Sequence, residues 1–199
     1  APYGASKTLL NSYVSNNIKY GVVGAGHLGS FHAMQISKII NVQLVGVYDV
    51  VSNKSKELCL KYNLRMFKSL EELLAACDAV SICTPAINHF DVAKKALYNN
   101  CHIFIEKPLT LTCSDAKEAI KVTESAGVVL QVGHHRRRCS ANRKIKSFID
   151  SGELGVLHQM QANLSLAGGL EPRPGWRNDP EESPAGSMCG LGVHMIDNL

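Results

Sequence analysis

The chain has 199 residues, a formal net charge of +4 and 45% apolar residues. This length fits one large domain, or one domain with part of another, and the apolar share suffices for an ordinary core. The small net charge gives no indication of a nucleic-acid partner, and no apolar stretch approaches the ~20 residues of a membrane helix.

Seven cysteines are scattered along the chain without any CxxC pair. Their number is odd and several lie inside apolar runs, which indicates reduced thiols in a cytoplasmic protein. No cysteines and histidines have the spacing of a zinc site, so we expect no metal. Residues 1–17 are polar and lack the apolar segment of a signal peptide, which predicts an N-terminal extension.

Strands and helices are predicted to alternate from residue 18 to residue 134. The strands are nearly continuous apolar runs joined to helices by short connections, which is typical of a parallel sheet covered on both faces. The expected fold class is therefore α/β, a doubly wound Rossmann sheet. The strands are expected at 18–26, 42–49, 78–85, 101–108 and 128–134, and the helices at 27–40, 52–63, 69–77, 89–100 and 114–127. Ser52 is expected to cap the second helix, and Ser69 with Glu72 has the spacing of a capping box at the third.

The pattern changes after residue 135. A helix is predicted at 142–155, and alternating polarity predicts a half-exposed strand at 156–169. A loop is expected at 171–187, followed by a helix that the end of the chain interrupts. These elements indicate the beginning of a second domain.

A GxGxxG turn, GAGHLG, occupies residues 24–29. It follows a predicted strand and opens a helix, and Asp49 stands ~20 residues further on at the end of the next strand, as in dinucleotide-binding sites. The Asp49 carboxylate can accept hydrogen bonds from the ribose and repels a 2′-phosphate, which favours NAD over NADP. An ordinary glycine-rich turn is the alternative. The expected cofactor contacts in the turn are Gly24, Gly26, His27, Leu28 and Gly29.

Three later strand ends carry polar residues. Because ligands of doubly wound sheets bind outside the carboxyl ends of the strands, we expect these residues to line the cleft. They are Thr84 and Pro85, with His89 just beyond; Glu106, Lys107 and Pro108; and Gly133 and His134.

Four segments occur in the order and at separations typical of one protein family: GVVGAGHLGSFHA, SICTPAINHF, IFIEKPLT and GSMCGLGVHMID. With them the chain resembles the Gfo/Idh/MocA oxidoreductase family from residue 18 to its end. Its first 135 residues are similar to nucleotide-sugar members such as UDP-N-acetylglucosamine 3-dehydrogenases. The resemblance implies a Rossmann domain at 18–135. It also implies that 136–199 form a linker helix and the truncated start of an α+β domain, which has an open, mostly antiparallel sheet and carries the homo-oligomer interface.

The resemblance also implies roles for the EKP segment. In the family its lysine, here Lys107, faces the nicotinamide and the substrate hydroxyl, and the bond to Pro108 is commonly cis. A cation there stabilises the developing alkoxide. Glu106 would hold the lysine or contact the nicotinamide ribose. A surface salt bridge is the alternative.

His194, in GLGVHMID, matches the histidine that the resemblance assigns as proton acceptor. The family aspartate four residues earlier is replaced by Gly190. Asp197, one helical turn later, is expected on the helix surface; a partial replacement of the missing aspartate is the alternative. A helix-start histidine that contacts only backbone is the alternative for His194.

The segment GHHRRRCSANRK departs from the family after the last predicted Rossmann strand. Gly133 and Arg137 match, and Arg137 is assigned to the cofactor site. His134 and the 138–140 stretch differ. His134 is assigned to the substrate side with Lys107, His194, Trp176 and Arg177. Trp176 and Arg177 would line either the substrate cleft or a subunit interface.

A basic run, Arg136 to Arg138 with Lys144 and Lys146, either binds a phosphorylated or nucleotide-linked substrate or is a solvated helix face. The expected function is an NAD-dependent dehydrogenase acting on a secondary alcohol of a sugar, cyclitol or nucleotide-sugar, without nucleic-acid or membrane partners. A non-catalytic NAD-binding or redox-sensing protein is the alternative, because Gly190 and the 138–140 stretch depart from the family pattern.

Overall fold

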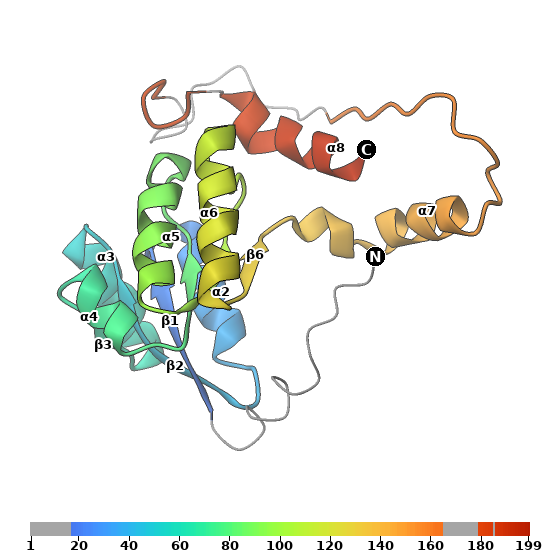
Figure 1. Cartoon of the computed structure of the whole chain (residues 1–199). Helices are drawn as coiled ribbons and strands as arrows, with labels where there is room; N and C mark the ends of the chain where they lie inside the picture. The colour runs from blue at the N-terminus through green and yellow to red at the C-terminus, as the bar shows by residue number, and fades with distance from the viewer. Residues whose placement is uncertain (1–16, 165–178, 185) are drawn as a thin grey trace.

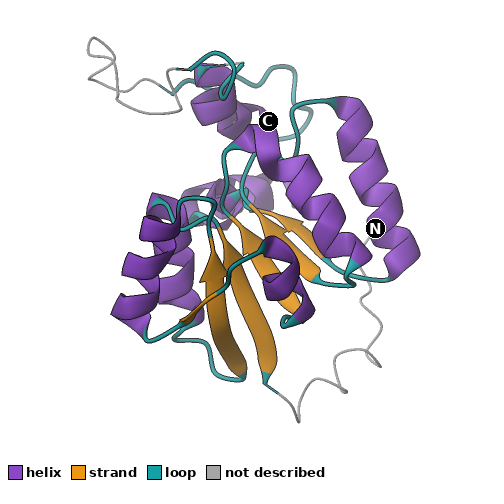
Figure 2. Cartoon of the chain, turned by 90° about the vertical axis from the view of Figure 1, so that its left-hand side faces the viewer, coloured by secondary structure: helices purple, strands orange, loops and turns teal. Residues whose placement is uncertain are grey.

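The computed structural model of the chain describes residues 17–164, 179–184 and 186–199. Within this part, six parallel strands form one sheet in the order β3-β2-β1-β4-β5-β6, with helices on both sides (Figure 2). The predicted doubly wound Rossmann fold is confirmed. The strands are β1 (Ile18–Val23), β2 (Val42–Tyr48), β3 (Arg65–Met66), β4 (Ala79–Ile82), β5 (His102–Ile105) and β6 (Leu130–Val132).

The helices divide between the two faces of the sheet. The main helices are α2 (His27–Ile36), α3 (Ser52–Tyr62), α4 (Leu70–Ala75), α5 (His89–Tyr98), α6 (Cys113–Ala126), α7 (Ser140–Asp150) and α8 (Val193–Asn198). Shorter turns are the 3-10 helices η1 (Ala86–Asn88) and η2 (His135–Arg138) and the π-helical turn η4 (Met188–Gly192).

Adjacent residues of β1 belong to opposite halves of the core. Val22 packs with residues of α2 and α3, whereas Val23 packs with residues of α4 and α5. Both side chains are almost completely buried. A strand covered on both faces needs apolar side chains at successive positions, which explains why the strand sequences do not alternate.

Local capping agrees with the sequence at one helix and differs at another. Ser69 caps α4 as predicted, since its Oγ accepts from the Glu72 amide at 3.1 Å. Ser52, expected as a cap, is instead the first residue of α3, and Val51 occupies the cap position without a side-chain bond in the described structure. The amide of this N-cap residue, Val51, donates to Asp49 Oδ1 at 2.8 Å, so the Asp49 carboxylate is tied to the start of α3.

The predicted strand at 156–169 is wrong over its described part. Residues 156–164 form an extended segment without strand pairing, almost wholly exposed, and 165–169 lie outside the described residues. Together with α7 this segment reaches away from the sheet (Figure 1). An alternating segment gains strand structure only from a neighbouring strand, and none of the described residues supplies one here.

The two-residue strand β3 was not predicted, because it is too short to carry a polarity pattern. No helix in the described ranges is long and apolar enough to cross a membrane.

Candidate active site

The glycine turn between β1 and α2 has a different constraint at each glycine. Gly24 has φ +95°, and a Cβ there would lie 2.8 Å from the Cys83 carbonyl group. A Cβ at Gly29 would lie 1.8 Å from the Gly24 carbonyl oxygen. A Cβ at Gly26 would meet no described atom within 4 Å. The outer glycines therefore allow the tight turn, and the middle one leaves the open approach that a pyrophosphate needs.

The N-terminus of α2 faces the same space. Gly26 is its N-cap, no side chain of the described structure caps it, and its first turn contains no acidic residue. Uncapped amides and the helix dipole favour an anion. The predicted contact residues begin the helix, with Leu28 38% exposed and the His27 ring packed edge-on against Phe31 at 4.9 Å.

Asp49, at the end of β2, is held by two backbone amides. Its Oδ2 accepts from Ala25 N at 2.6 Å and its Oδ1 accepts from Val51 N at 2.8 Å. Each carboxylate oxygen has more than one acceptor position, so the same group can also accept from ribose hydroxyls. The carboxylate is fixed beside the glycine turn, where the sequence predicts the adenosine ribose.

The loop after β4 contains a buried polar group without a partner. Thr84 Oγ1 forms no hydrogen bond with any described atom, although it is buried. Buried hydroxyls are normally paired, so this orphan suits a ligand bound at the carboxyl ends of the strands. The residues at this edge of the sheet thus fit a dinucleotide.

His89 connects two of the predicted strand ends. It is 1% exposed, with Nδ1 2.6 Å from the Pro108 carbonyl oxygen and Nε2 3.0 Å from the Thr84 carbonyl oxygen. Burial lowers the pKa of the imidazole, although both carbonyl contacts act in the opposite direction. His89 thereby fixes the loop after β4 against the EKP segment.

Lys107 follows β5, and its peptide bond to Pro108 is cis. Its Nζ donates to the carbonyl oxygens of Gly190 at 2.8 Å and Cys189 at 3.2 Å. The side chain thus reaches the η4 turn that precedes α8. At Gly190, where the family pattern has an aspartate, the backbone carbonyl accepts from the lysine instead.

Glu106 contacts a histidine that the sequence did not identify as a site residue. His32 Nε2 lies 3.1 Å from Glu106 Oε1, and His32 Nδ1 lies 3.0 Å from Ser81 Oγ. Burial alone would raise the pKa of Glu106, but the His32 contact and the Lys107 charge outweigh burial and lower it. The available signal was the position of His32 one turn after Gly29 on the cofactor helix.

His194, near the start of α8, is 5% exposed, and its Nδ1 is buried without a hydrogen-bond partner among the described residues. Its ring lies edge-on to His135 at 4.8 Å. Burial lowers its pKa to about 4, with the charges of Lys107, His135, Arg136 and His134 acting in the same direction. At neutral pH His194 is therefore an uncharged acceptor beside a lysine.

Asp197 anchors α8 to η2, so its expected place on the helix surface is wrong. Its carboxylate accepts from Arg137 Nε at 2.9 and 3.0 Å and from the Arg137 terminal nitrogen at 2.6 Å. His134 Nδ1 lies 3.3 Å away, and the Asp197 side chain is only 6% exposed. The fold thus couples Arg137, predicted at the cofactor site, to the helix that carries His194.

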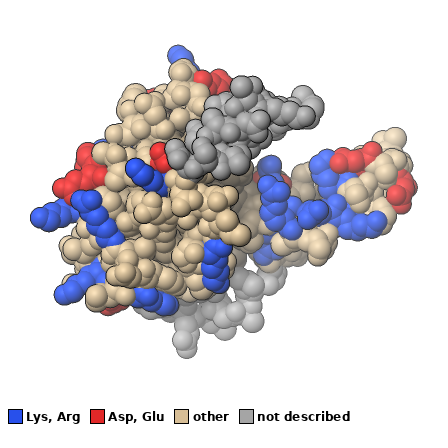
Figure 3. Space-filling view, turned by 90° about the horizontal axis from the view of Figure 1, so that it is seen from below, with Lys and Arg blue, Asp and Glu red and all other residues tan. Residues whose placement is uncertain are grey.

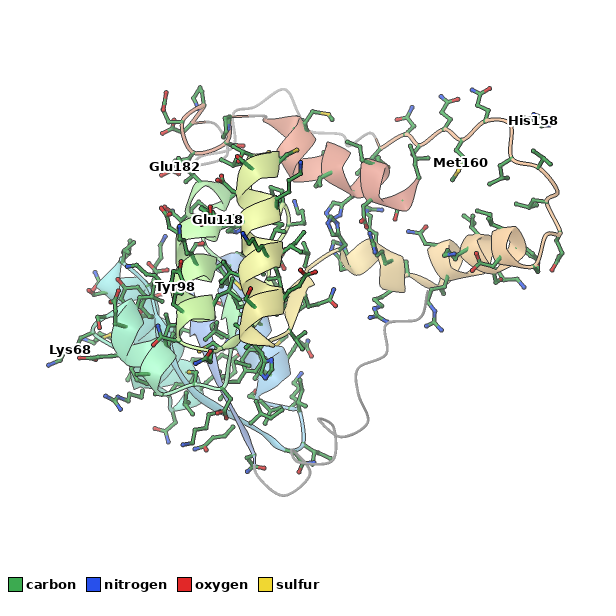
Figure 4. All side chains as sticks on the ribbon, viewed as in Figure 1. Lys68, Tyr98, Glu118, His158, Met160 and Glu182 are labelled. Atoms are coloured by element: carbon green, nitrogen blue, oxygen red, sulfur yellow. The ribbon has the colours of Figure 1, made fainter. Side chains whose placement is uncertain are left out.

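The remaining predicted residues are Trp176, Arg177 and the basic run. Trp176 and Arg177 lie outside the described residues. Lysines and arginines gather on η2 and α7 (Figure 3). Within this run Arg137 bonds to Asp197 and the Arg136 charge acts on His194, whereas Lys146 on α7 pairs with Asp150. His158 and Met160 project from the extended segment beyond α7 (Figure 4). Among described residues, no three His, Cys, Asp or Glu side chains group as metal ligands.

Two family profiles match the chain. Residues 18–134 match the oxidoreductase family with an NAD-binding Rossmann fold, and residues 142–199 match the GFO/IDH/MocA C-terminal domain. The chain is 40% identical over 121 residues to a UDP-N-acetylglucosamine 3-dehydrogenase of Acidithiobacillus ferrooxidans (61% of this chain, 38% of the relative). It is 29% identical over 181 residues to a glucose-6-phosphate 3-dehydrogenase of Bacillus subtilis (90% of this chain, 52% of the relative).

Solved structures agree with the profiles. An oxidoreductase of Desulfitobacterium hafniense, named as NADPH-dependent, has a TM-score of 0.84 and 32% identity, covering 92% of this chain and 55% of that one. A scyllo-inositol dehydrogenase of Lactobacillus casei has a TM-score of 0.66 and 28% identity, covering 70% and 43%. The chain spans about half the length, or less, of the curated relatives it matches.

Proposed function

The chain belongs to the Gfo/Idh/MocA family of oxidoreductases, and we propose that it transfers a hydride between NAD and a secondary alcohol of a sugar, cyclitol or nucleotide-sugar. The observation that carries this proposal is the meeting of Lys107 with the turn before His194. A cation and a neutral buried imidazole then lie near one another at the sheet edge that carries the dinucleotide-type turn. An alcohol dehydrogenation needs these two groups.

Lys107 and His194 have complementary tasks in this proposal. The Lys107 ammonium polarises the substrate oxygen and stabilises the negative charge that develops as the hydroxyl proton departs. The unpartnered Nδ1 of His194 accepts that proton. The Lys107 charge also lowers the pKa of His194, so the imidazole is neutral before substrate binds. When bound, the nicotinamide ring supplies the hydride acceptor.

The cofactor contacts belong to the glycine turn, the α2 N-terminus, Asp49 and Thr84. The open space at Gly26 and the orphaned Thr84 hydroxyl support a bound dinucleotide. The Asp49 carboxylate supports NAD in preference to NADP, because it would repel a 2′-phosphate. The similar structure named as NADPH-dependent makes this preference worth testing.

Calorimetric titration of the chain with NAD and with NADP tests the cofactor preference. We expect tighter NAD binding in the wild type and weaker NAD binding in Asp49→Ala. Asp49→Asn is the matched control, since it keeps the size of the side chain and removes the charge, and NADP should gain relative to NAD. Tighter binding of NADP by the wild type would contradict the preference.

The substrate class is proposed from two supports. Relatives are named for UDP-N-acetylglucosamine and glucose 6-phosphate, which both carry phosphate. The basic residues of η2 and α7 lie in the segment that follows β6, and we propose that they bind an anionic group of the substrate. In a longer protein we propose that the rest of the second domain completes the substrate site and forms a homo-oligomer.

A sugar panel with NAD tests the function. NADH absorbance should rise with at least one sugar, cyclitol or nucleotide-sugar, and Lys107→Ala should abolish the rise. Lys68→Ala, at an exposed lysine far from η2 and α7 (Figure 4), is the control for a general effect of removing a cation. The panel should be run on this chain and on any longer natural form.

The replacement of the family aspartate by Gly190 favours a second candidate, an NAD-binding or redox-sensing protein without turnover. Tight NAD binding with no turnover on the panel would support this candidate and reject the dehydrogenase. Turnover that depends on Lys107 would reject it.

A further inference from the structure

Four polar side chains form a continuous hydrogen-bonded chain between the sheet and the EKP segment. Tyr20 Oη, on β1, lies 3.2 Å from Ser81 Oγ on β4. Ser81 Oγ lies 3.0 Å from His32 Nδ1 on α2, and His32 Nε2 lies 3.1 Å from Glu106 Oε1 after β5. We name these residues the Tyr20–Glu106 chain. None of its inner members was identified from the sequence.

With an ionised Glu106 and a neutral His32, the partners determine the direction of every hydrogen bond in the Tyr20–Glu106 chain. An ionised Glu106 only accepts, so His32 must donate from Nε2. A neutral His32 then accepts at Nδ1 from the Ser81 hydroxyl. Ser81 in turn accepts from the Tyr20 hydroxyl. The network is complete with a neutral imidazole in its Nε2–H tautomer, whereas a protonated His32 would donate from Nδ1 to Ser81 Oγ and turn the Ser81 hydroxyl hydrogen away from the ring.

The surroundings keep this arrangement in place. Ser81 is 1% exposed, and the side chains of His32 and Glu106 are 17% and 14% exposed. The His32 ring packs against Phe104 of β5 with ring centroids 5.2 Å apart. Burial raises the pKa of Tyr20, which keeps its hydroxyl a donor. Buried networks of this kind hold one geometry when every member is satisfied.

The Tyr20–Glu106 chain connects the part of the site proposed to bind the cofactor with the part proposed to act on the substrate. In the proposed function the first turn of α2 binds the cofactor, and His32, on the next turn of the same helix, contacts Glu106. Glu106 immediately precedes Lys107, whose charge acts on it. Gly133 leaves the carboxylate its room, since a Cβ there would lie 3.3 Å from Glu106 Oε1.

We propose that His32 is a positioning residue, held as the Nε2–H tautomer by Ser81, that fixes the Glu106 carboxylate and through it the Lys107 ammonium. This inference deepens the proposed dehydrogenase function and rests on it for its catalytic consequence. The structural half of the proposal, which is the His32 tautomer and its hydrogen bond to Glu106, can be tested on the protein without ligand. The two halves can therefore be tested separately.

The first experiment measures the His32 tautomer by long-range ¹H–¹⁵N correlation NMR in the cofactor-free chain. We expect Nε2–H in the wild type and in Tyr20→Phe, because Ser81 still donates to Nδ1 in that variant. Ser81→Ala removes the donor, so Nδ1–H should become populated. A wild-type His32 that is Nδ1–H or doubly protonated at neutral pH would overturn the proposal, whether or not the protein has any activity.

The second experiment follows the Glu106 carboxyl by ¹³C NMR through a pH titration. In His32→Leu the burial of Glu106 remains while its hydrogen bond is lost, so the titration midpoint should rise. His32→Gln should restore the midpoint in part, because its amide can donate to Glu106 and accept from Ser81. Gln35→Ala, an exposed position on the same helix, is the matched control. A midpoint in His32→Leu equal to that of Gln35→Ala would overturn the proposal.

The third experiment uses turnover on a substrate found in the sugar panel. We expect His32→Leu to lower kcat about tenfold or more while NAD affinity in calorimetry stays within about twofold. His32→Gln should recover part of kcat. A His32→Leu kcat equal to that of Gln35→Ala would overturn the positioning role. Wild-type inactivity would reject the dehydrogenase, and the two NMR experiments would still decide the structural half.

Discussion

Lys107 and Gly190 show how one residue substitution changes the electrostatics of a site without removing its geometry. The lysine donates to the Gly190 carbonyl at 2.8 Å, so a backbone dipole occupies the place of the family carboxylate. A dipole holds the cation more weakly than an ion pair does. Two predictions at the scale of single residues follow from this cluster.

Restoring the aspartate should strengthen the lysine contact. A Cβ at Gly190 would meet no described atom within 4 Å, so Gly190→Asp fits without displacing a neighbour. We expect a gain of about 1 kcal/mol in the free energy of unfolding from a charge-assisted hydrogen bond, with a rise in kcat/KM. Urea denaturation measures the first effect. Gly190→Asn, which lacks the charge, should give neither gain, and equal behaviour of the two variants would refute the prediction.

The acid limb of the activity should report His194. The imidazole has a pKa of about 4 in the fold against an ordinary value of 6.5, so it is neutral above about pH 4. Activity should therefore fall only as the pH drops through about 4. Folding stability should decline between 6.5 and about 4, where the unfolded chain binds the proton first.

Histidine NMR and the pH profile of kcat/KM together check this value. We expect the His194 ring to titrate near 4, and the acid limb to disappear with the activity in His194→Gln. A ring that titrates near its ordinary 6.5 would mean that burial and the neighbouring charges do not act as the geometry indicates.

At the scale of elements, the βα turn and helix α8 have different kinds of constraint. The turn is determined locally by close backbone approaches, whereas α8 is held by contacts to distant segments. Substitutions in the glycine turn should therefore affect folding and cofactor binding separately. A substitution at the α8 anchor should affect the local stability of α8 more than the stability of the whole fold.

Two glycines of the turn should give opposite outcomes. Gly29→Ala places a methyl group 1.8 Å from the Gly24 carbonyl oxygen, so the free energy of unfolding should fall by about 1–3 kcal/mol. Gly26→Ala meets no described atom within 4 Å, so stability should change by less than about 1 kcal/mol. NAD affinity of Gly26→Ala should nevertheless fall about tenfold, because the methyl group enters the pyrophosphate approach. Calorimetry and urea denaturation on both variants decide this.

Asp197→Asn should loosen α8 specifically. The substitution removes the charge that three Arg137 bonds share and leaves a nearly buried amide, at a cost of about 1–2 kcal/mol for a pair with one exposed partner. Hydrogen exchange of the α8 amides should accelerate. Asp150→Asn, which removes an exposed pair on α7, should leave α8 unchanged, and equal exchange in both variants would contradict the anchoring role.

At the scale of the whole molecule, one parallel sheet positions the candidate site. The carboxyl ends of β1, β2, β4, β5 and β6 bring the glycine turn, Asp49, Thr84, Lys107 and His134 to a common edge. Residues from the far end of the chain then close over this edge, since Lys107 bonds to η4 and Arg137 bonds to α8. This arrangement agrees with the family match, and the proposed chemistry follows from the residues that meet at this edge of the sheet.

The sequence by itself determined the Rossmann sheet, the glycine turn with its acid, and the family. Continuous apolar strands and the GxGxxG spacing are local patterns, because two-sided burial and a tight turn constrain neighbouring residues directly. The capping by Ser69 was predictable for the same reason. The strand expected at 156–169 failed over its described part, because strand structure depends on a partner that polarity alternation cannot supply.

Only the tertiary structure decided the contacts between distant segments. His32 meets Ser81 and Glu106, Lys107 meets Gly190, and Asp197 is buried against Arg137, although nothing in the spacing of these residues indicates their pairing. Side-chain partners across a sheet edge depend on strand order, strand register and the return of the chain end. Strand order, register and the return of the chain end arise from the packing of the whole chain, so they cannot be predicted from a local sequence pattern.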